Sequence, residues 1–483
     1  MMLGPPRQPA GAPDSSAPTP LPVTQRKKKS VLRDPVHGDI YLSEEELQVI
    51  DTPEFQRLRG VRQLGAAYLV YPGALHTRFE HSIGTLHLTQ RLIDAVNLNF
   101  ELSPSTCLSV SAEETRLIRM AALLHDVTHI PFGHNIEDQS GLLERHDSPA
   151  RFEGLLAPRR ALGRRLSELG LARDVGRILL PLEHPDRAGL PPYWSQLLSD
   201  TICSDILDYL ARDAYFTGLK LGIDERLINY FKVDRRSGNL YIDLAKSELL
   251  REDILSEIVR VLEARYYFSE RVYYHHAKVS AGALVARLTE LCLSAGLVSE
   301  RELYDQTDQS LLELYARAGE RAAAQGQAAL GRRILRLVER FRSRTLFKRA
   351  CVFPRPLNLA VQEQLVERYF ARGRAQARAE VETRIADLVR FATGQEVEVI
   401  VYCPAARMQL KEALTHVRWP GEPVPRPLSD FSERVPRLAD LERSYRDLWK
   451  FYVLVDTHDS GLQRKVAEIA CGEFPGAVNA YSP

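Results

Sequence analysis

The segment AALLHDVTH, residues 121–129, constrains the fold more than any other part of the chain. Its apolar residues predict a buried helix, and that helix ends on the pair His125–Asp126. A buried imidazole and a buried carboxylate cost free energy unless both groups bind something. Neutral imidazole and carboxylate are natural ligands for a divalent transition metal. We therefore expect the fold to bring further ligands to this helix end.

Two distant segments can supply those ligands. His81 lies in HTRFEHSIG at an expected helix start, from which it can approach His125. Asp205 lies in SDTICSDILDYLARD on another expected helix. Along that helix Asp205, Tyr209 and Asp213 recur at intervals of four residues, which places them on one face. That face can line a pocket.

A third group of titratable residues follows the His–Asp pair closely: His129, His134, Glu137 and His146. Imidazoles titrate near neutrality, so this group suits proton transfer to a leaving oxygen. An alternative for the whole set is a buried cluster that only satisfies its own hydrogen bonds. For His146 the alternative is an ordinary surface histidine.

The composition excludes several classes of protein. The 64 basic and 63 acidic residues give a net charge of +1, and 45% of the chain is hydrophobic, which is ordinary globular usage. These values exclude a disordered chain, a collagen-like fibre and a polybasic scaffold. No run approaches the roughly 18–20 apolar residues that span a bilayer, and the first residues do not resemble a signal peptide. We expect a cytoplasmic protein with no membrane partner.

The chain is expected to be mainly α, with a disordered Pro-rich and basic tail over residues 1–30, a helical core over 31–300, and a helical and α+β C-terminal lobe over 301–483. The basic run Arg26–Lys29 and the Arg-rich helices of the lobe can touch nucleic acid, but solvated surfaces are the favoured interpretation. Strands are expected at Asp39–Leu42, in a hairpin around residues 232–244, and at Glu396–Tyr402. Periodicity and caps predict helices after Ser43, from Pro53, and over His81–Val96, Ala112–Leu124, Ser195–Ala211, Ile254–Tyr274, Leu284–Ala295, Gln309–Ala318, Arg332–Arg344 and Gln362–Arg390.

The order of these motifs resembles that of a known family. HTRFEHS, LLHDVTHIPFGH and DILDYLARD carry an isolated histidine, a His–Asp pair and a distant aspartate, which is similar to the signature of the HD-domain metal-dependent phosphohydrolases. Their spacing resembles the deoxynucleoside triphosphate triphosphohydrolase branch, including the HD core of the animal SAM- and HD-domain-containing dNTPases. The resemblance covers roughly residues 30–350. It implies an HD-domain catalytic core over 31–300, with no SAM domain before Val31.

The resemblance also implies roles for individual residues. The implied metal ligands are His81, His125, Asp126 and Asp205. They would hold one divalent transition metal (Fe, Mn, Zn, Ni or Co), with Mg accompanying the nucleotide phosphates. Attack at the α-phosphorus would release a deoxynucleoside and triphosphate. The implied proton-transfer residues are the general acid His134 and a relay of His129, Glu137 and His146, in which Glu137 replaces the usual Asp.

Substrate contacts follow from the same resemblance. The positions that match the nucleotide pocket of the family are Gln63, Leu64, Arg78, Tyr209, Asp213, Arg265 and Tyr273. Arg78 would bind the α-phosphate, because a guanidinium suits bidentate phosphate contacts. Gln63 and Leu64 would line the sugar. Both tyrosines can equally be core residues on apolar helix faces.

Ile206 departs from the family pattern, which has Lys or Arg directly after the last ligand aspartate to hold the terminal phosphates. Losing a desolvated charged contact costs about 1.5–3 kcal/mol. Either the substrate carries fewer phosphates or another base compensates, the candidates being Lys220, Arg212, Arg271 and Lys278. Thr128 and Ile130 also replace family glycines, so this turn must suit β-branched residues.

Two segments resemble the family's allosteric guanine-nucleotide site. IDTPEFQRLR contributes Asp51, Gln56 and Arg59, and RTLFK contributes Arg344 and Lys348. Such a site would lie between subunits and implies a homotetramer that a guanine nucleotide assembles and activates. The alternatives are a cap in the helix region for Asp51 and a solvated helix face for the two bases.

Three functional hypotheses remain open at this point. The first is a metal-dependent hydrolase that converts deoxynucleoside triphosphates to deoxynucleoside and triphosphate. The second is an HD phosphohydrolase that acts on another nucleotide, such as a monophosphate or a cyclic phosphodiester. The third is a nucleotide-sensing or nucleic-acid-binding protein, although a pure binder has no use for the predicted proton-transfer histidines.

Overall fold

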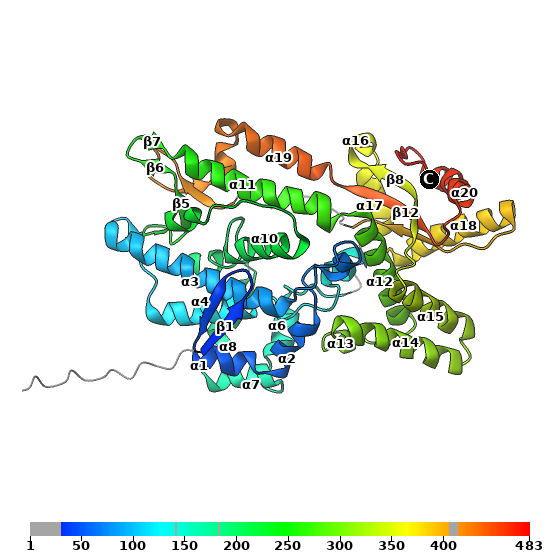
Figure 1. Ribbon diagram of the computed structural model, residues 1–483, viewed down its shortest axis with the longest axis horizontal. Coiled ribbons are helices and arrows are strands. Elements are labelled where there is room, and N and C mark those ends of the chain that lie inside the picture. Colours follow the sequence, from blue (N-terminus) through cyan, green and yellow to red (C-terminus); the bar gives the residue numbers. More distant parts are fainter. Residues whose placement is uncertain (1–29, 141–142, 182–183, 405–413) are drawn as a thin grey trace, which may run out of the picture.

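Figure 1 shows a computed structural model of the chain, which describes residues 30–140, 143–181, 184–404 and 414–483. The expected tail, with its basic run Arg26–Lys29, lies outside the described residues except for Ser30. The described part is mainly helical with small sheets, which confirms the predicted fold class. None of the helices in these ranges is long and apolar enough to cross a membrane.

The N-terminal elements are two strands and two short helices: β1 (Ser30–Asp34), β2 (Gly38–Leu42), α1 (Glu44–Ile50) and α2 (Pro53–Gln56). The two strands pair antiparallel as a hairpin. Ser43 caps α1 in a capping box with Glu46, as predicted. The buried side chains of Ile40 and Leu42 attach the hairpin to the main hydrophobic core.

The helical core is built around one long helix, α3, which packs against both α4 and α10. Apolar side chains of all three helices are buried in a single cluster. The helices of this region are α3 (Arg78–Leu102), α4 (Ala112–Leu124), α5 (Gly133–Ser140), α6 (Pro149–Leu156), α7 (Ala161–Glu168), α8 (Ala172–Leu179), α9 (Tyr193–Gln196), α10 (Ser204–Thr217) and α11 (Glu252–Phe268). The predicted boundaries of α4 are confirmed at both ends.

A five-stranded sheet of order β11-β10-β5-β4-β3 lies beside these helices. Its strands are β3 (Cys107–Leu108), β4 (Phe231–Asp234), β5 (Leu240–Asp243), β10 (His416–Arg418) and β11 (Arg426–Pro427), and a separate pair joins β6 (Ala245–Lys246) to β7 (Leu249–Leu250). The predicted hairpin is the antiparallel pair β4–β5. Residues 414–446 return from late in the chain, because β10 pairs parallel with β5 and α19 (Pro436–Arg446) packs on α11.

The C-terminal part has two further hydrophobic clusters (right side of Figure 1). One contains α12 (His276–Ser294), α14 (Asp308–Ala324) and α15 (Ala328–Arg342), preceded by the short α13 (Glu300–Leu303). The other surrounds an antiparallel sheet of order β8-β12-β9. Its elements are β8 (Lys348–Pro354), α16 (Arg355–Asn358), α17 (Gln362–Phe370), α18 (Ala375–Thr393), β9 (Val399–Tyr402), β12 (Lys450–Val455) and α20 (Ser460–Glu473).

Two predicted helices are broken in the structure, and two strands were not predicted. The helix expected over Ser195–Ala211 is two, α9 and α10, because the polar run before Cys203 makes local hydrogen bonds that compete with a helix. The helix expected over Gln362–Arg390 breaks into α17 and α18 around Gly373, whose φ is +82°. Strands β8 and β12 were not predicted, since a short apolar run is also compatible with a buried helix segment.

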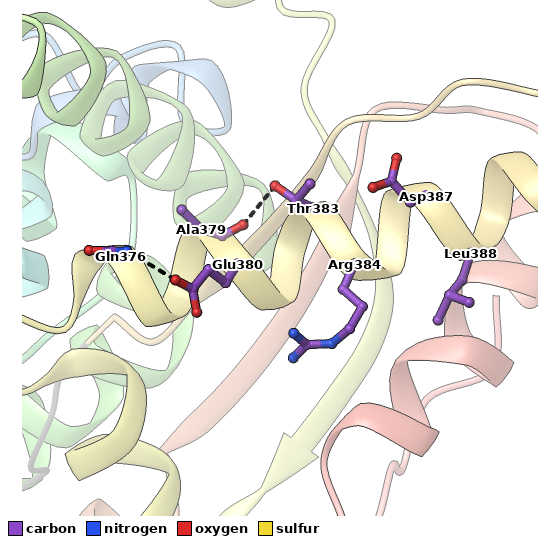
Figure 2. A pocket seen from close by; sticks show the side chains of 7 residues that line it. All are labelled: Gln376, Ala379, Glu380, Thr383, Arg384, Asp387 and Leu388. Carbon is purple, nitrogen blue, oxygen red and sulfur yellow. Dashed lines mark hydrogen bonds between the residues drawn. The ribbon is translucent and has the colours of Figure 1, made fainter.

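Figure 2 shows a groove along one face of α18. Gln376 bonds to Glu380 at 3.1 Å and Thr383 to the Ala379 carbonyl at 2.8 Å within the helix, whereas Arg384 donates to Glu473 of α20 at 2.8 Å. All the lining residues come from this single helix. It contains none of the residues that the sequence predicts to be functional, so the candidate site lies elsewhere.

Candidate metal centre and active site

Three predicted metal ligands converge from three helices. His81 lies in the first turns of α3, His125 is the C-cap of α4, and Asp205 lies in the first turn of α10. The Nε2 atoms of the two histidines are 3.1 Å apart, and Asp205 Oδ1 lies 3.1 Å from His81 Nε2 and 3.7 Å from His125 Nε2. Candidate ligand atoms of all three residues lie within 4.8 Å of one another.

The outer hydrogen bonds show which nitrogen of each ring faces the centre. His81 Nδ1 lies 2.7 Å from Asp208 Oδ2, and His125 Nδ1 lies 2.7 Å from the Ala122 carbonyl oxygen. Because these oxygens accept hydrogen bonds, each neutral ring carries its proton on Nδ1 and its lone pair on Nε2. Two lone pairs that face each other beside a carboxylate require a cation or a proton between them. The donor set therefore fits a divalent transition metal.

Asp126, the fourth predicted ligand, lies next to this centre but has other partners. Its carboxylate oxygens are 3.7 Å from His81 Nε2 and 3.6 Å from His125 Nε2. Arg78 donates a hydrogen bond to Oδ2, and His129 Nε2 lies 3.2 Å from Oδ1. Asp126 thus connects the metal centre to the guanidinium predicted to bind phosphate.

Burial and charge keep the carboxylates of this centre ionised. Burial alone would lower the pKa of His81, but the carboxylates of Asp205 and Asp208, which accept hydrogen bonds from the protonated ring, raise it to about 10, so a proton on Nε2 takes the place of a cation there. Burial alone would raise the pKa of Asp205, but His125 and His81 hold it below its ordinary value. The pKa of Asp126 likewise lies well below its ordinary value, since burial is outweighed by Arg78 and neighbouring histidines. The centre therefore presents negative charge to a cation.

A second histidine cluster lies beside the first. The rings of His129 and His146 stack with centroids 3.6 Å apart at 20°, and the exposed His134 meets both rings edge-on at 5.2 and 5.1 Å. Glu137 Oε2 lies 2.8 Å from His146 Nδ1. His129 Nδ1 is buried without a hydrogen-bond partner in the described part of the chain. The four predicted proton-transfer residues thus form one connected group that reaches Asp126.

This second cluster is less suited to a metal than the first. Nitrogen atoms of its three histidines also lie within 4.8 Å of one another. However, an imidazole lone pair lies in the ring plane, and two nearly parallel rings at 3.6 Å cannot both point at one ion. Acid–base catalysis needs only one ring within hydrogen-bond reach of the substrate, so it stays the predicted role of this cluster.

The predicted pocket residues form a second connected group near α10. Asp213 accepts a hydrogen bond from the Tyr273 hydroxyl at 2.7 Å and lies 2.8 Å from His76 Nε2. Arg265 is hydrogen-bonded to Tyr209, and its pKa is raised although burial alone would lower it. His76, which the sequence analysis did not assign, belongs to this group. Its position five residues before His81 was the available signal.

The remaining pocket residues lie on the loop that leads into α3. The backbone N–H of Gln63 donates to the His76 carbonyl at 3.1 Å, and its Oε1 is buried without a partner among the described residues. Leu64 is buried in the main core. A buried amide oxygen beside an apolar side chain is consistent with a sugar contact, which stays a prediction.

Comparison with known families explains this arrangement. The HD domain model matches residues 78–212 and the model of the HD associated region matches residues 249–470. The first match contains all four predicted metal ligands. The chain contains an HD domain followed by an HD associated region.

Individual relatives of this HD-domain chain are moderately similar. An uncharacterized protein of Methanocaldococcus jannaschii is 31% identical over 260 residues, which are 53% of this chain and 48% of that protein. Deoxynucleoside triphosphate triphosphohydrolase SAMHD1 of Danio rerio is 31% identical over 273 residues, 51% of this chain and 42% of that protein. The chain spans about half the length of the curated relatives it matches.

A solved structure shares the fold. The crystal structure of a hypothetical protein from Aquifex aeolicus has a TM-score of 0.61 and 22% sequence identity. It covers 92% of this chain, and this chain covers 100% of it. The fold of that structure therefore extends over nearly the whole chain.

The structure separates the four bases considered as replacements at Ile206. Arg212 is excluded, because its buried guanidinium is held by Asp208 and Asp34. Lys220 and Arg271 are exposed, and Arg271 lies over the Tyr267 ring at 4.7 Å. Lys278 is partly buried, and its Nζ lies 5.5 Å from the Tyr273 ring centroid and 3.3 Å from the Tyr273 carbonyl oxygen.

The predicted allosteric residues lie in two parts of the chain. Asp51 is the C-cap of α1, Gln56 Oε1 accepts from Arg59 Nε at 2.8 Å, and the Arg59 guanidinium covers the Phe79 ring. Arg344, with a φ of +57°, donates from Nε to the Leu69 carbonyl, and Lys348 begins β8. A nucleotide site shared by the two parts stays a prediction.

Proposed function

We propose that this HD-domain protein hydrolyses deoxynucleoside triphosphates to deoxynucleoside and triphosphate. The observation that carries the proposal is the pair of Nε2 atoms of His81 and His125, which face each other 3.1 Å apart beside Asp205. The likeness to deoxynucleoside triphosphate triphosphohydrolases over about half of the chain supports the substrate class.

The residues that would hold the metal are His81, His125, Asp126 and Asp205. When bound, a divalent metal supplies Lewis acidity toward a phosphate oxygen and an activated water. Arg78 lies at the same point, and its Nε is buried without a partner in the described residues. A phosphate oxygen can accept from this donor, so Arg78 would orient the α-phosphate beside the metal.

The second histidine cluster would protonate the leaving 5′-oxygen. His134 is its exposed member and therefore the one that a substrate can reach. Burial alone would raise the pKa of Glu137, but the hydrogen bond with His146 lowers it. The Glu137 carboxylate thereby orients the His146 ring, whose edge-on neighbour is the exposed His134.

Lys278 would supply the phosphate contact that Ile206 cannot. Its Nζ lies beside Tyr273, whose hydroxyl is bonded to Asp213 in the predicted nucleotide pocket. The base therefore approaches from α12, whereas the family pattern places it on the helix that carries the last ligand aspartate. Burial lowers the pKa of Lys278 to about 8, with Asp213 opposing the shift. The amine is charged near neutrality and is ready to pair with an anion.

The test of the substrate class is product analysis. Metal-loaded protein is incubated with each deoxynucleoside and ribonucleoside triphosphate, and the products are separated. Nucleoside together with inorganic triphosphate supports the proposal. Orthophosphate alone, or turnover of monophosphates but not triphosphates, contradicts it and supports an HD phosphohydrolase for another nucleotide, the alternative that Ile206 favours.

A guanine-nucleotide activator and a homotetramer belong to the same proposal. Gln56 and Arg59 are hydrogen-bonded to each other, and Asp51 is exposed. The polar groups of these three residues can contact a nucleotide base. Sizing chromatography and rate measurements, each with and without GTP or dGTP, test this part. An unchanged mass together with an unchanged rate contradicts it and leaves the catalytic proposal intact.

A further inference from the structure

Asp208 is a buried carboxylate that the proposed chemistry does not use. It lies on α10, three residues after Asp205, and it is fully buried. Its Oδ2 accepts from His81 Nδ1 at 2.7 Å, and its Oδ1 lies 2.6 Å from His37 Nε2. Arg212 donates to both oxygens at 2.9 Å. Four hydrogen bonds occupy the whole acceptor capacity of a carboxylate.

One partner of Asp208 and one partner of Arg212 come from the N-terminal hairpin. Asp34 is the last residue of β1, and His37 lies in the turn that follows. Asp34 Oδ1 accepts the backbone N–H groups of Val36 and His37 at 2.9 and 2.8 Å. Asp34 Oδ2 accepts from Arg212 Nη1 at 2.8 Å. One short turn therefore holds Asp208 twice, directly through His37 and indirectly through Arg212.

The surrounding backbone leaves room for this network. Gly84 lies on α3 three residues after His81. A Cβ atom at Gly84 would overlap Asp208 Oδ1 and Arg212 Nη2. The side chains of His37, Asp208 and Arg212 are almost completely removed from solvent. Such a network is rigid, because no member can move without leaving a buried charge unpaired.

We infer that Asp208 is a positioning residue for His81, and that the turn Asp34–Gly38 is part of the support of the metal centre. The Asp208 carboxylate keeps the His81 proton on Nδ1, so Nε2 keeps its lone pair and its direction toward His125. An outer carboxylate of this kind also makes an imidazole a stronger ligand. The turn fixes the carboxylate through His37 and Arg212.

The first test measures metal binding, not turnover. Metal-free full-length protein is titrated with Co²⁺ or Mn²⁺, and Kd is measured by calorimetry. Asp208→Asn should raise Kd by about 10- to 100-fold, the usual effect of losing an outer partner of a metal-bound histidine. The absorption spectrum of the Co²⁺ form should also change, because the His81 ring is less constrained. An unchanged Kd overturns the inference.

A double-mutant cycle separates positioning from general damage. If Asp208 acts through His81, then Asp208→Asn should change Kd by less than about twofold in a His81→Gln background. Residual binding by His125, Asp126 and Asp205 provides the reference value. An equally large effect of Asp208→Asn in both backgrounds would show a merely structural role.

The hairpin offers its own matched pair. Asp34→Asn removes the charge that holds Arg212, whereas Asp39→Asn removes a charge from the same hairpin that pairs only with exposed Arg33. The first variant should weaken Co²⁺ binding several-fold and the second should not. His37→Gln, which leaves the Arg212 contacts intact, should also weaken binding. Wild-type affinity in both Asp34→Asn and His37→Gln overturns the role of the turn.

These measurements do not depend on the substrate. A wrong substrate class would leave every expected change in Kd intact. Loss of the expected changes would leave the hydrolysis proposal intact, because the four ligands would still bind metal. The two proposals can therefore fail separately.

Discussion

Two histidine clusters of similar composition meet at Asp126, and they differ in how their rings are held. In the first, Asp208 and the Ala122 carbonyl hold the Nδ1 atoms of His81 and His125, so both Nε2 atoms face one point. In the second, His129 and His146 stack with nearly parallel rings. Proximity of imidazoles alone therefore does not distinguish a metal site from a proton relay. The direction of the lone pairs shows which of the two clusters can hold a cation.

The largest effect should come from removing a ligand of the first cluster. His125→Ala should abolish hydrolysis and weaken metal binding by more than about 100-fold, beyond the usual effect of an outer-partner loss. Most of the helical content should remain, since the side chain is at the end of α4. Metal content by elemental analysis and circular dichroism check this. Full activity of the variant would contradict the ligand assignment.

Substitutions in the second cluster should lower the rate of hydrolysis without changing metal binding. His146→Gln should lower kcat by about 100- to 10,000-fold, the range for a lost acid–base group, with unchanged metal content. His184→Gln, at a surface turn away from both clusters, serves as the control and should keep the wild-type rate. Loss of metal from the first variant would show that the two clusters are not separate.

A pair of glycines gives a sharper comparison. Gly84→Ala should weaken metal binding by about 10- to 100-fold, because the added Cβ displaces Asp208, the outer partner of His81. Gly133→Ala places a Cβ 2.9 Å from His129 Nδ1, so it should lower kcat and leave metal affinity unchanged. Parallel measurements of Kd and kcat on both variants test this. Identical patterns in the two variants would contradict the division between the clusters.

The smallest expected effect concerns Lys278, which lies outside both clusters. Its pKa of about 8 is lowered by burial, so the amine loses its charge as pH rises through that value. KM for a triphosphate should therefore rise about three- to tenfold between about pH 7 and pH 9, since a charged contact weakens. Lys278→Arg stays charged and should remove this rise. A rise that persists in Lys278→Arg would exclude Lys278 as its source.

The motifs permitted prediction of the ligand set but not of its surroundings. His81, His125 and Asp205 lie on helix ends that periodicity and caps indicate, and the structure brings them together. The network of Asp34, His37 and Asp208 could not be predicted, because it joins residues about 170 positions apart through a hairpin turn. Arg212 was wrongly considered as a phosphate contact, since only packing shows that two carboxylates hold it.

The fold shows the same division. The amphipathic helix α4 was predicted to the residue, whereas the strands β8 and β12 were missed. The return of residues 414–446 to β5 and α11 has no local signal either. Long-range pairing depends on which apolar faces meet, and a one-dimensional pattern contains no information about that choice.

The residue types and spacing alone determined the chemistry of the candidate centre: two imidazoles and two carboxylates at helix ends, with titratable groups following. This is so because ligand identity and helix periodicity are properties of the chain itself. Only the tertiary structure decided which ring nitrogens face inward and which base is available to a phosphate. Those properties depend on side chains from distant segments, whose hydrogen bonds form only once the helices pack.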